Sequence, residues 1–183
     1  MTDTITERQP APNDLEFEQR TVRTGGEPET RMPIDLTYPS ADLAQARAVV
    51  HSAQLLYTFW NTGDTTFVDQ AIAPGFKDNT LPPGHAQGPT GPTAASAAFR
   101  TAVPDLTCQL SDLYVAGDTF TARLVFPRHF TGTDIGIRGR GQTINFNVID
   151  IQHVGADARI TEDWHLEVNL TFLRQAGLIT IAG

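Results

Sequence analysis

The sequence predicts a single α+β domain, in which helices come first and a curved sheet of antiparallel strands follows. Three observations support this class. Apolar residues recur at helical spacing after residue 40, apolar and polar residues alternate between residues 106 and 166, and glycine-containing turns separate the alternating runs. With 183 residues, 40% of them hydrophobic, the chain can bury one sizeable core.

The N-terminal segment, residues 1–38, is predicted to be a disordered or extended arm before a domain at residues 39–183. Its first 32 residues contain only seven apolar side chains, together with seven acidic and four basic ones. So little apolar surface cannot offset the entropy lost on ordering the segment.

The first helix is expected behind Ser40, a good N-cap residue, and to end at Gly63, a natural left-handed C-cap. A short second helix is predicted over residues 65–72. The segment 82–92 holds four prolines and three glycines and is predicted to be a loop. A third, alanine-rich helix should cover residues 93–103 and end before a proline.

The alternating part of the chain predicts four strands, over residues 106–115, 119–130, 143–153 and 159–166. A short closing helix should follow near residues 170–177. Such a sheet, curled around the first helix, would leave a pocket between its concave face and the helices.

Composition excludes several classes of function. The net charge of −8 argues against a nucleic-acid partner, and no apolar run reaches the roughly 18 residues of a membrane span. The single cysteine, Cys108, excludes a disulfide framework and a multi-cysteine zinc site, and His51, His85 and His153 lack ligand spacing. With no leader at the start, we expect a cytoplasmic protein that handles a small molecule without a metal.

Four segments in order resemble the SnoaL-like polyketide cyclase (ester cyclase) family, within the nuclear-transport-factor-2-like superfamily. They are Tyr57–Asp64, Ala97–Leu106, Gly117–Arg123, and Arg159–His165 followed by Leu173–Gly177. The resemblance spans residues 41–179 and implies a cone-shaped α+β barrel, the curved sheet wrapping around the N-terminal helices.

The resemblance also implies an activity. Characterised cyclases of the family close a ring in a polyketide ester by an intramolecular aldol reaction, without a metal or organic cofactor. We therefore expect a cofactor-independent acid/base enzyme that cyclises or isomerises a small polyketide-like or apolar substrate. Epoxide hydrolysis on the same scaffold and non-catalytic binding of a small ligand are the alternatives. The family alone suggests a homo-oligomer, a dimer or tetramer.

The candidate catalytic residues lie on the last predicted strand, where Thr161, Asp163 and His165 share one face. In the family an acid/base aspartate commonly follows the tryptophan of this strand, and here His165 follows Trp164. We expect His165 to be the acid/base and Asp163 to support it. The alternative is a polar, solvated strand end. Val168 stands where many relatives have a further aspartate.

Six further residues are candidate substrate contacts: Asn147, His129, Asn79, Trp60, Tyr57 and Arg123. Asn147 could donate to a substrate carbonyl, or bond to a neighbouring strand. Arg123 and His129 share one strand face unless Pro127 introduces a bulge, and a salt bridge is the alternative role for Arg123. Tyr57 and Trp60 would face the sheet as core or pocket wall, and Asn79 takes a position where relatives often carry a histidine. Asp150 is interpreted as mainly structural.

Overall fold

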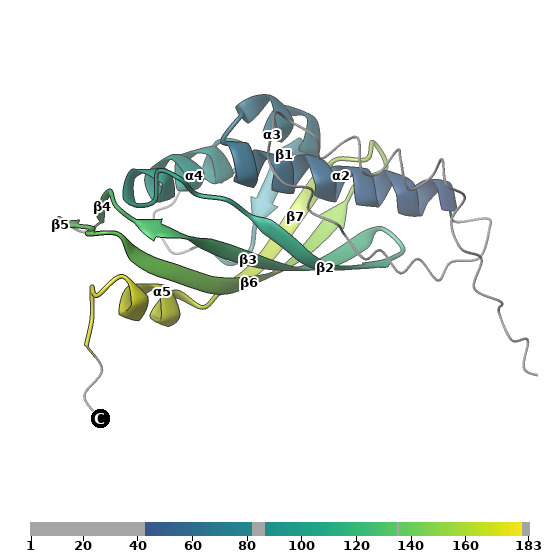
Figure 1. Cartoon of the computed structure of the whole chain (residues 1–183). Coiled ribbons are helices and arrows are strands. Elements are labelled where there is room, and N and C mark those ends of the chain that lie inside the picture. Colours follow the sequence, from purple (N-terminus) through teal and green to yellow (C-terminus); the bar gives the residue numbers. More distant parts are fainter. Residues whose placement is uncertain (1–42, 82–86, 135, 181–183) are drawn as a thin grey trace, which may run out of the picture.

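The computed structural model describes residues 43–81, 87–134 and 136–180. Figure 1 shows α2, α3 and α4 above one face of a curved sheet, with α5 at the opposite side of one end. The elements in chain order are α2 Leu43–Thr62, α3 Thr65–Ala71, β1 Ile72–Asp78, α4 Thr90–Ala102, β2 Gln109–Ala116, β3 Thr119–Phe130, β4 Thr133–Asp134, β5 Ile137–Arg138, β6 Gln142–Val154, β7 Ile160–Glu167 and α5 Asn169–Gln175.

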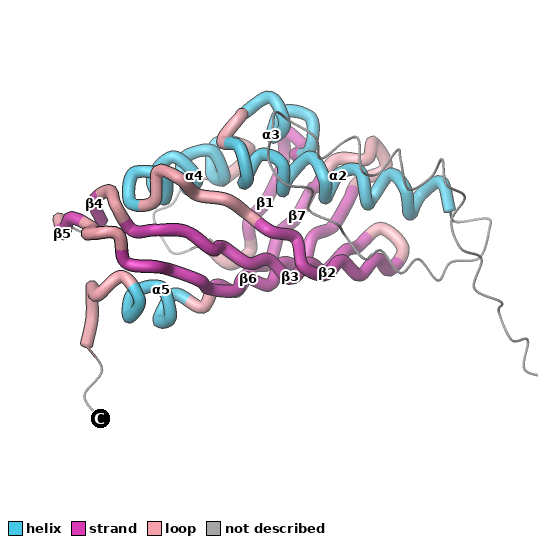
Figure 2. Tube along the Cα trace, viewed as in Figure 1, coloured by secondary structure: helices cyan, strands magenta, loops and turns pink. Residues whose placement is uncertain are grey.

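The main sheet has the strand order β1-β7-β6-β3-β2, and β4 and β5 form a separate two-stranded hairpin. All neighbours in the main sheet are antiparallel except β1 and β7, which run parallel. The helices and the sheet form separate layers (Figure 2). The predicted α+β class with a curved sheet is therefore confirmed. Among the described residues the sheet stays open, with β1 and β2 as its edges.

The register between β3 and β6 decides which side chains face α2. It runs without a break from Thr119 opposite His153 to Phe130 opposite Gln142. Even-numbered residues of both strands face α2, on what we call the inner face, and odd-numbered residues lie on the outer face. Pro127 lies beyond the last β2 partner of β3, where its missing N–H leaves no ladder bond unmade. No bulge therefore turns the face of β3 before His129.

Aromatic side chains fill the inner space at the end of the sheet nearest α4 and α5. Their ring centroids lie 5.3–6.5 Å apart, mostly edge to face. They are Trp60, Phe99, Phe126, Phe130, Phe146 and Phe172. Because these six residues come from five elements, α2, α4, β3, β6 and α5, their packing joins the three helices and the sheet into one core.

The segment between α3 and the predicted loop at residues 82–92 forms a strand that the sequence analysis did not predict. Residues 72–78, for which no strand was predicted, form β1, an edge strand parallel to β7. Pro74 and Gly75 lie within this strand, and an edge strand tolerates proline. The pairing of β1 with β7 shifts its register between Ile72 and Lys77, which marks a bulge in the strand.

None of the described helices is both long and apolar enough to span a membrane. The predicted arm, residues 1–38, lies outside the described residues.

Gly132 provides a test of the close approach between the end of β3 and α4. A Cβ atom built there would lie 1.8 Å from the carbonyl oxygen of Thr101, whereas one at Gly75 would meet nothing within 4 Å. Because backbone must move to admit it, we expect Gly132→Ala to lower the free energy of unfolding in urea by about 2 kcal/mol or more. The control Gly75→Ala should change it by less than about 0.5 kcal/mol. Equal effects of the two variants would contradict this packing.

Candidate acid/base site

The candidate site lies at the edge of the sheet, where β1 and β7 run side by side. Their parallel register places Asp78 opposite Asp163. A shift in the register between β6 and β7 leaves both Ile160 and Asp163 buried, so Asp163 faces inward in spite of its odd spacing from Ile160. Each carboxylate residue is only 8% exposed.

His165 lies between these two carboxylates. Its Nδ1 is 3.0 Å from Asp163 Oδ2, 3.5 Å from Asp78 Oδ2 and 3.0 Å from Thr80 Oγ1. The hydrogen bond with Asp163, helped by the charges of Asp163, Asp78 and Glu167, raises the pKa of His165 to about 9, although burial acts the other way. The imidazole is therefore protonated at neutral pH. Its Nε2 makes no hydrogen bond to any described residue.

Asp163 uses both of its carboxylate oxygens. Oδ2 accepts from His165, and Oδ1 accepts from Gln152 Nε2 at 2.6 Å on the neighbouring strand. Burial raises the pKa of Asp163, while the hydrogen bond and charge of His165 oppose that rise. Held from two sides, this carboxylate can orient His165 and balance its charge.

Asp78 is held by the residues that follow it. The backbone N–H and the hydroxyl of Thr80 donate to its Oδ1 at 2.9 and 2.8 Å. The Gln87 side chain bonds to both the N–H and the carbonyl of Asp78, at 2.9 and 2.7 Å. The sequence pattern did not single out Asp78, because only the parallel pairing of β1 with β7 brings it to His165.

Two predicted substrate contacts lie near this site. Asn79 follows β1, and its side chain donates to Glu162 Oε2 at 3.0 Å. The Tyr57 hydroxyl, from α2, donates to Asp150 Oδ2 at 3.0 Å inside the protein. Asp150 faces inward from β6, directly opposite His165. Burial, with a smaller contribution from the charge of Asp163, raises the pKa of Asp150 to about 7.

The structure does not bring the other predicted contacts to His165. Asn147 and Arg123 lie on the outer face, where the Arg123 guanidinium contacts both Asn147 and Asp112. His129 is also on that face and pairs with Asp105 at 3.3 Å. Trp60 packs among the aromatic side chains near α4. Strand parity thus directs three of these four side chains outward, away from His165, and their contact with a substrate stays a prediction.

The donor atoms of Asp78, Asp163 and His165 lie within 4.8 Å of one another, a spacing that a metal ion could bridge. A metal ion bound there would have to displace the proton from Nδ1 of His165, because a protonated Nδ1 has no lone pair to offer. The expected metal-free and cofactor-independent chemistry stays a prediction, as does the pocket beside the helices.

Most of the predicted domain matches the sequence model of a known protein family. Residues 50–176 match the sequence model described as SnoaL-like polyketide cyclase. This range runs from the middle of α2 to the end of α5 and includes every residue of the site described above. Among curated proteins, none matches the chain closely enough to count as a relative.

Solved structures share the fold over most of their length. A protein of Bacillus cereus ATCC 10987, described as a presumed polyketide cyclase, is 40% identical, with a TM-score of 0.68 over 82% of this chain and 93% of its own. TsrD of Streptomyces laurentii is 25% identical, with a TM-score of 0.63 over 78% and 99%. IdmH of Streptomyces antibioticus, also a presumed polyketide cyclase, is similar in fold, at 23% identity and a TM-score of 0.63 over 70% and 98%.

The charge on His165 can be tested by a change to its partner. Asp163→Asn removes the carboxylate that stabilises the imidazolium, so we expect the pKa of His165 to fall from about 9 toward its ordinary value near 6.5. A titration of the histidine ring resonances by NMR measures this shift. Asp118→Asn, beside the exposed His153, is the matched control and should leave His165 unchanged. Titration of His165 near 6.5 in the unmodified protein would contradict the described ion pair.

Proposed function

Because the chain belongs to the SnoaL-like polyketide cyclase family, we propose that it is a cofactor-independent acid/base enzyme. It cyclises a small polyketide-like or apolar substrate by an intramolecular aldol reaction, or isomerises it. The observation that carries this proposal is the His165–Asp163 pair, which keeps a charged imidazole with a free N–H at the inner edge of the sheet.

The proposed reaction needs an acid for the carbonyl oxygen and a base for an acidic C–H. His165 is the acid: its Nε2–H donates to the carbonyl oxygen as negative charge develops there. Asp163 positions the ring through Nδ1 and stabilises its charge, and Gln152 holds Asp163 in place.

Epoxide hydrolysis would need a carboxylate free to activate water. Asp163 does not suit that task, because both of its oxygens already accept hydrogen bonds. Arg123 and His129, which could have polarised an epoxide oxygen, lie on the outer face. These observations argue against hydrolysis by Asp163 with Arg123 or His129, and the two reactions are distinguished by their products.

Two probes distinguish these reactions. A linear poly-β-keto methyl ester should give a cyclised product, detected by chromatography and mass spectrometry, and cyclohexene oxide should give no diol. His165→Ala should lower kcat by about 10²–10⁴-fold, the usual contribution of a general acid. His153→Ala, an exposed histidine paired with Asp118, is the matched control and should keep full activity.

Other outcomes overturn the proposal. Diol formation without cyclisation would identify a hydrolase. Lack of reaction with either probe would leave a non-catalytic binding module. Unchanged turnover in both His165→Ala and Asp163→Asn would remove the acid/base assignment.

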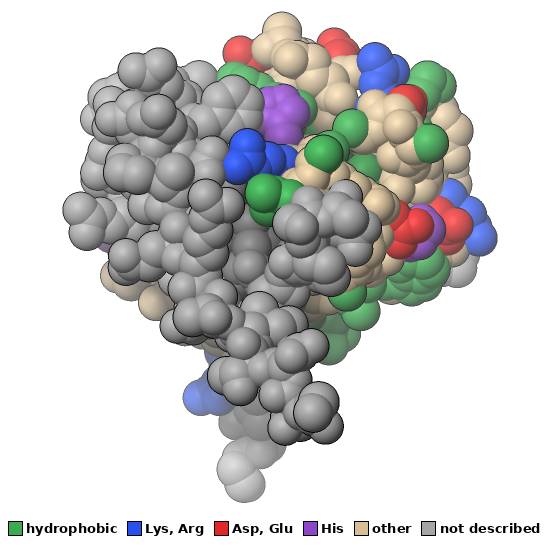
Figure 3. Space-filling model, turned by 90° about the vertical axis from the view of Figure 1, so that its right-hand side faces the viewer, with side chains coloured by type: hydrophobic (Ala, Val, Ile, Leu, Met, Phe, Trp, Pro, Cys, Tyr) green, Lys and Arg blue, Asp and Glu red, His purple; other side chains and the backbone are tan. Residues whose placement is uncertain are grey.

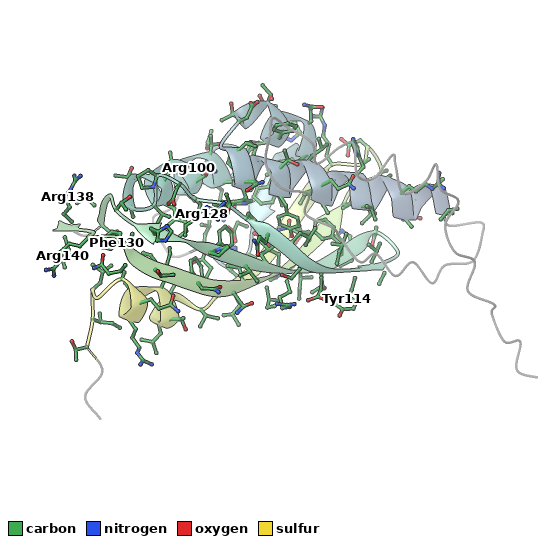
Figure 4. All side chains as sticks on the ribbon, viewed as in Figure 1. Arg100, Tyr114, Arg128, Phe130, Arg138 and Arg140 are labelled. Carbon is green, nitrogen blue, oxygen red and sulfur yellow. The ribbon has the colours of Figure 1, made fainter. Side chains whose placement is uncertain are left out.

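The outer face of the sheet carries an unusual apolar surface. Antiparallel sheets with one solvated face normally place polar residues there, yet three strands, β2, β6 and β7, carry large apolar side chains on this face. They are Tyr114, Ile149, Ile151, Trp164 and Leu166, between 38% and 72% exposed. Tyr114 projects from the side of the sheet away from α2 (Figure 4), and hydrophobic side chains gather on the lower part of the surface in Figure 3.

We infer that this outer face binds a second copy of the chain. The charged groups beside it, Asp112 and Arg123, neutralise each other. This ion pair adds no net charge to the face, although the whole chain carries a net charge of −8. A two-fold dimer can cover the same surface on both copies at once.

Sedimentation tests this interface. We expect the unmodified protein to be a dimer or tetramer at micromolar concentration, and Tyr114→Glu to shift it to monomer because it buries a charge in the contact. Ala94→Glu, on the exposed side of α4, adds the same charge elsewhere and should leave the assembly unchanged. A monomeric unmodified protein would refute the interface.

A further inference from the structure

The proposed aldol reaction still lacks a base, since His165 is already protonated and Asp163 is fully engaged. We propose that Asp150 is this base, a catalytic residue that removes the C–H proton, and that Tyr57 is its positioning residue. The inference rests on the proposed function and names the second proton-transfer group of the same site.

The strand register places Asp150 next to the acid. Asp150 on β6 and His165 on β7 are directly opposite each other in an antiparallel pair, and both face inward. Side chains in such pairs have Cβ atoms about 4.5–5.5 Å apart. A carboxyl and an imidazole at that separation can act on two neighbouring atoms of one small substrate.

Asp150 also has the fewest hydrogen bonds of the three inner carboxyls. Asp163 accepts from Gln152 and His165, and Oδ1 of Asp78 accepts twice from Thr80. Asp150 accepts only from the Tyr57 hydroxyl, through Oδ2. No other described residue bonds to its Oδ1, so this oxygen can take a proton from the substrate.

The surroundings of Asp150 make it a stronger base than an ordinary aspartate. From β7 it faces Asp163, His165 and Glu167, and from α2 it faces Tyr57. Cys108, before β2, is also close enough to feel its charge, and burial raises the pKa of that thiol and keeps it neutral. Asp150 is 5% exposed. A pKa of about 7 suits a base that works near neutral pH.

The proton transfers balance. Asp150 Oδ1 takes the proton from the acidic carbon, and the electron pair of that C–H bond forms the new C–C bond with the carbonyl carbon. The carbonyl oxygen receives the Nε2 proton of His165 and becomes a hydroxyl. The proton on Asp150 then returns to His165 through water, so that no acid or base is consumed.

The pH dependence of kcat with the poly-β-keto ester tests this assignment. Activity needs Asp150 ionised and His165 protonated, so we expect a bell-shaped profile with limbs at about pH 7 and about pH 9. Asp150→Asn should lower kcat by about 10²–10⁴-fold and remove the lower limb. Asp69→Asn, an exposed carboxylate on α3, should leave the profile unchanged.

Tyr57→Phe provides the conservative variant. The Tyr57 hydrogen bond favours the charged carboxylate and so lowers the pKa of Asp150. Its removal should therefore move the lower limb to higher pH, which a merely structural role for Tyr57 would not do. A lower limb that stays at pH 7 in Asp150→Asn, or that does not move in Tyr57→Phe, would overturn the proposal.

Carboxyl ¹³C NMR of labelled aspartate separates failure of this inference from failure of the proposed function. Titration of Asp150 near its ordinary value of about 4 would overturn the inference, whatever the activity. Titration near 7 together with unchanged turnover in His165→Ala would instead refute the proposed function. We expect Asp150 to titrate near pH 7 and His165→Ala to lose turnover.

Discussion

The positive charge on His165 is the constraint on which the rest of the site depends. Asp78 and Asp163 converge from adjacent strands while almost fully buried, and two buried carboxylates at that separation repel each other. A cation between them turns the repulsion into two attractions. The protonated imidazole therefore stabilises both buried carboxylates, and the same proton equips the site as an acid.

The remainder of the fold keeps this arrangement rigid. At the site, β1 contributes Asp78, β6 contributes Gln152, and β7 contributes Asp163 and His165. The helix α2 contributes Tyr57. At the other end of the sheet, where β7 has ended, the Gln175 side chain of α5 bonds to the backbone of Asn145 in place of a neighbouring strand. Aromatic packing at that end holds α5 and α4 against the sheet, and regular elements position side chains more accurately than loops do.

Much of this architecture could be predicted from hydrophobic spacing and turn residues, including the long strands and the shared face of Asp163 and His165. Spacing could not decide which face of β6 points inward, because both faces carry apolar residues, Val148 inside and Ile149 and Ile151 outside. Asn147 was therefore expected at the site and lies outside it. Asp78 was missed because proline and glycine obscure β1, and its role arises only from a pairing between distant segments.

We propose that Asp163 holds a proton on His165 and so makes His165 the acid of the site. Neutron diffraction from crystals grown at pH 8 in heavy water would observe this proton directly. We expect deuterium on both ring nitrogens of His165 and none on the Asp163 carboxylate, since pH 8 lies below the pKa of about 9. A neutral ring with a single deuterium, or a protonated Asp163, would contradict it.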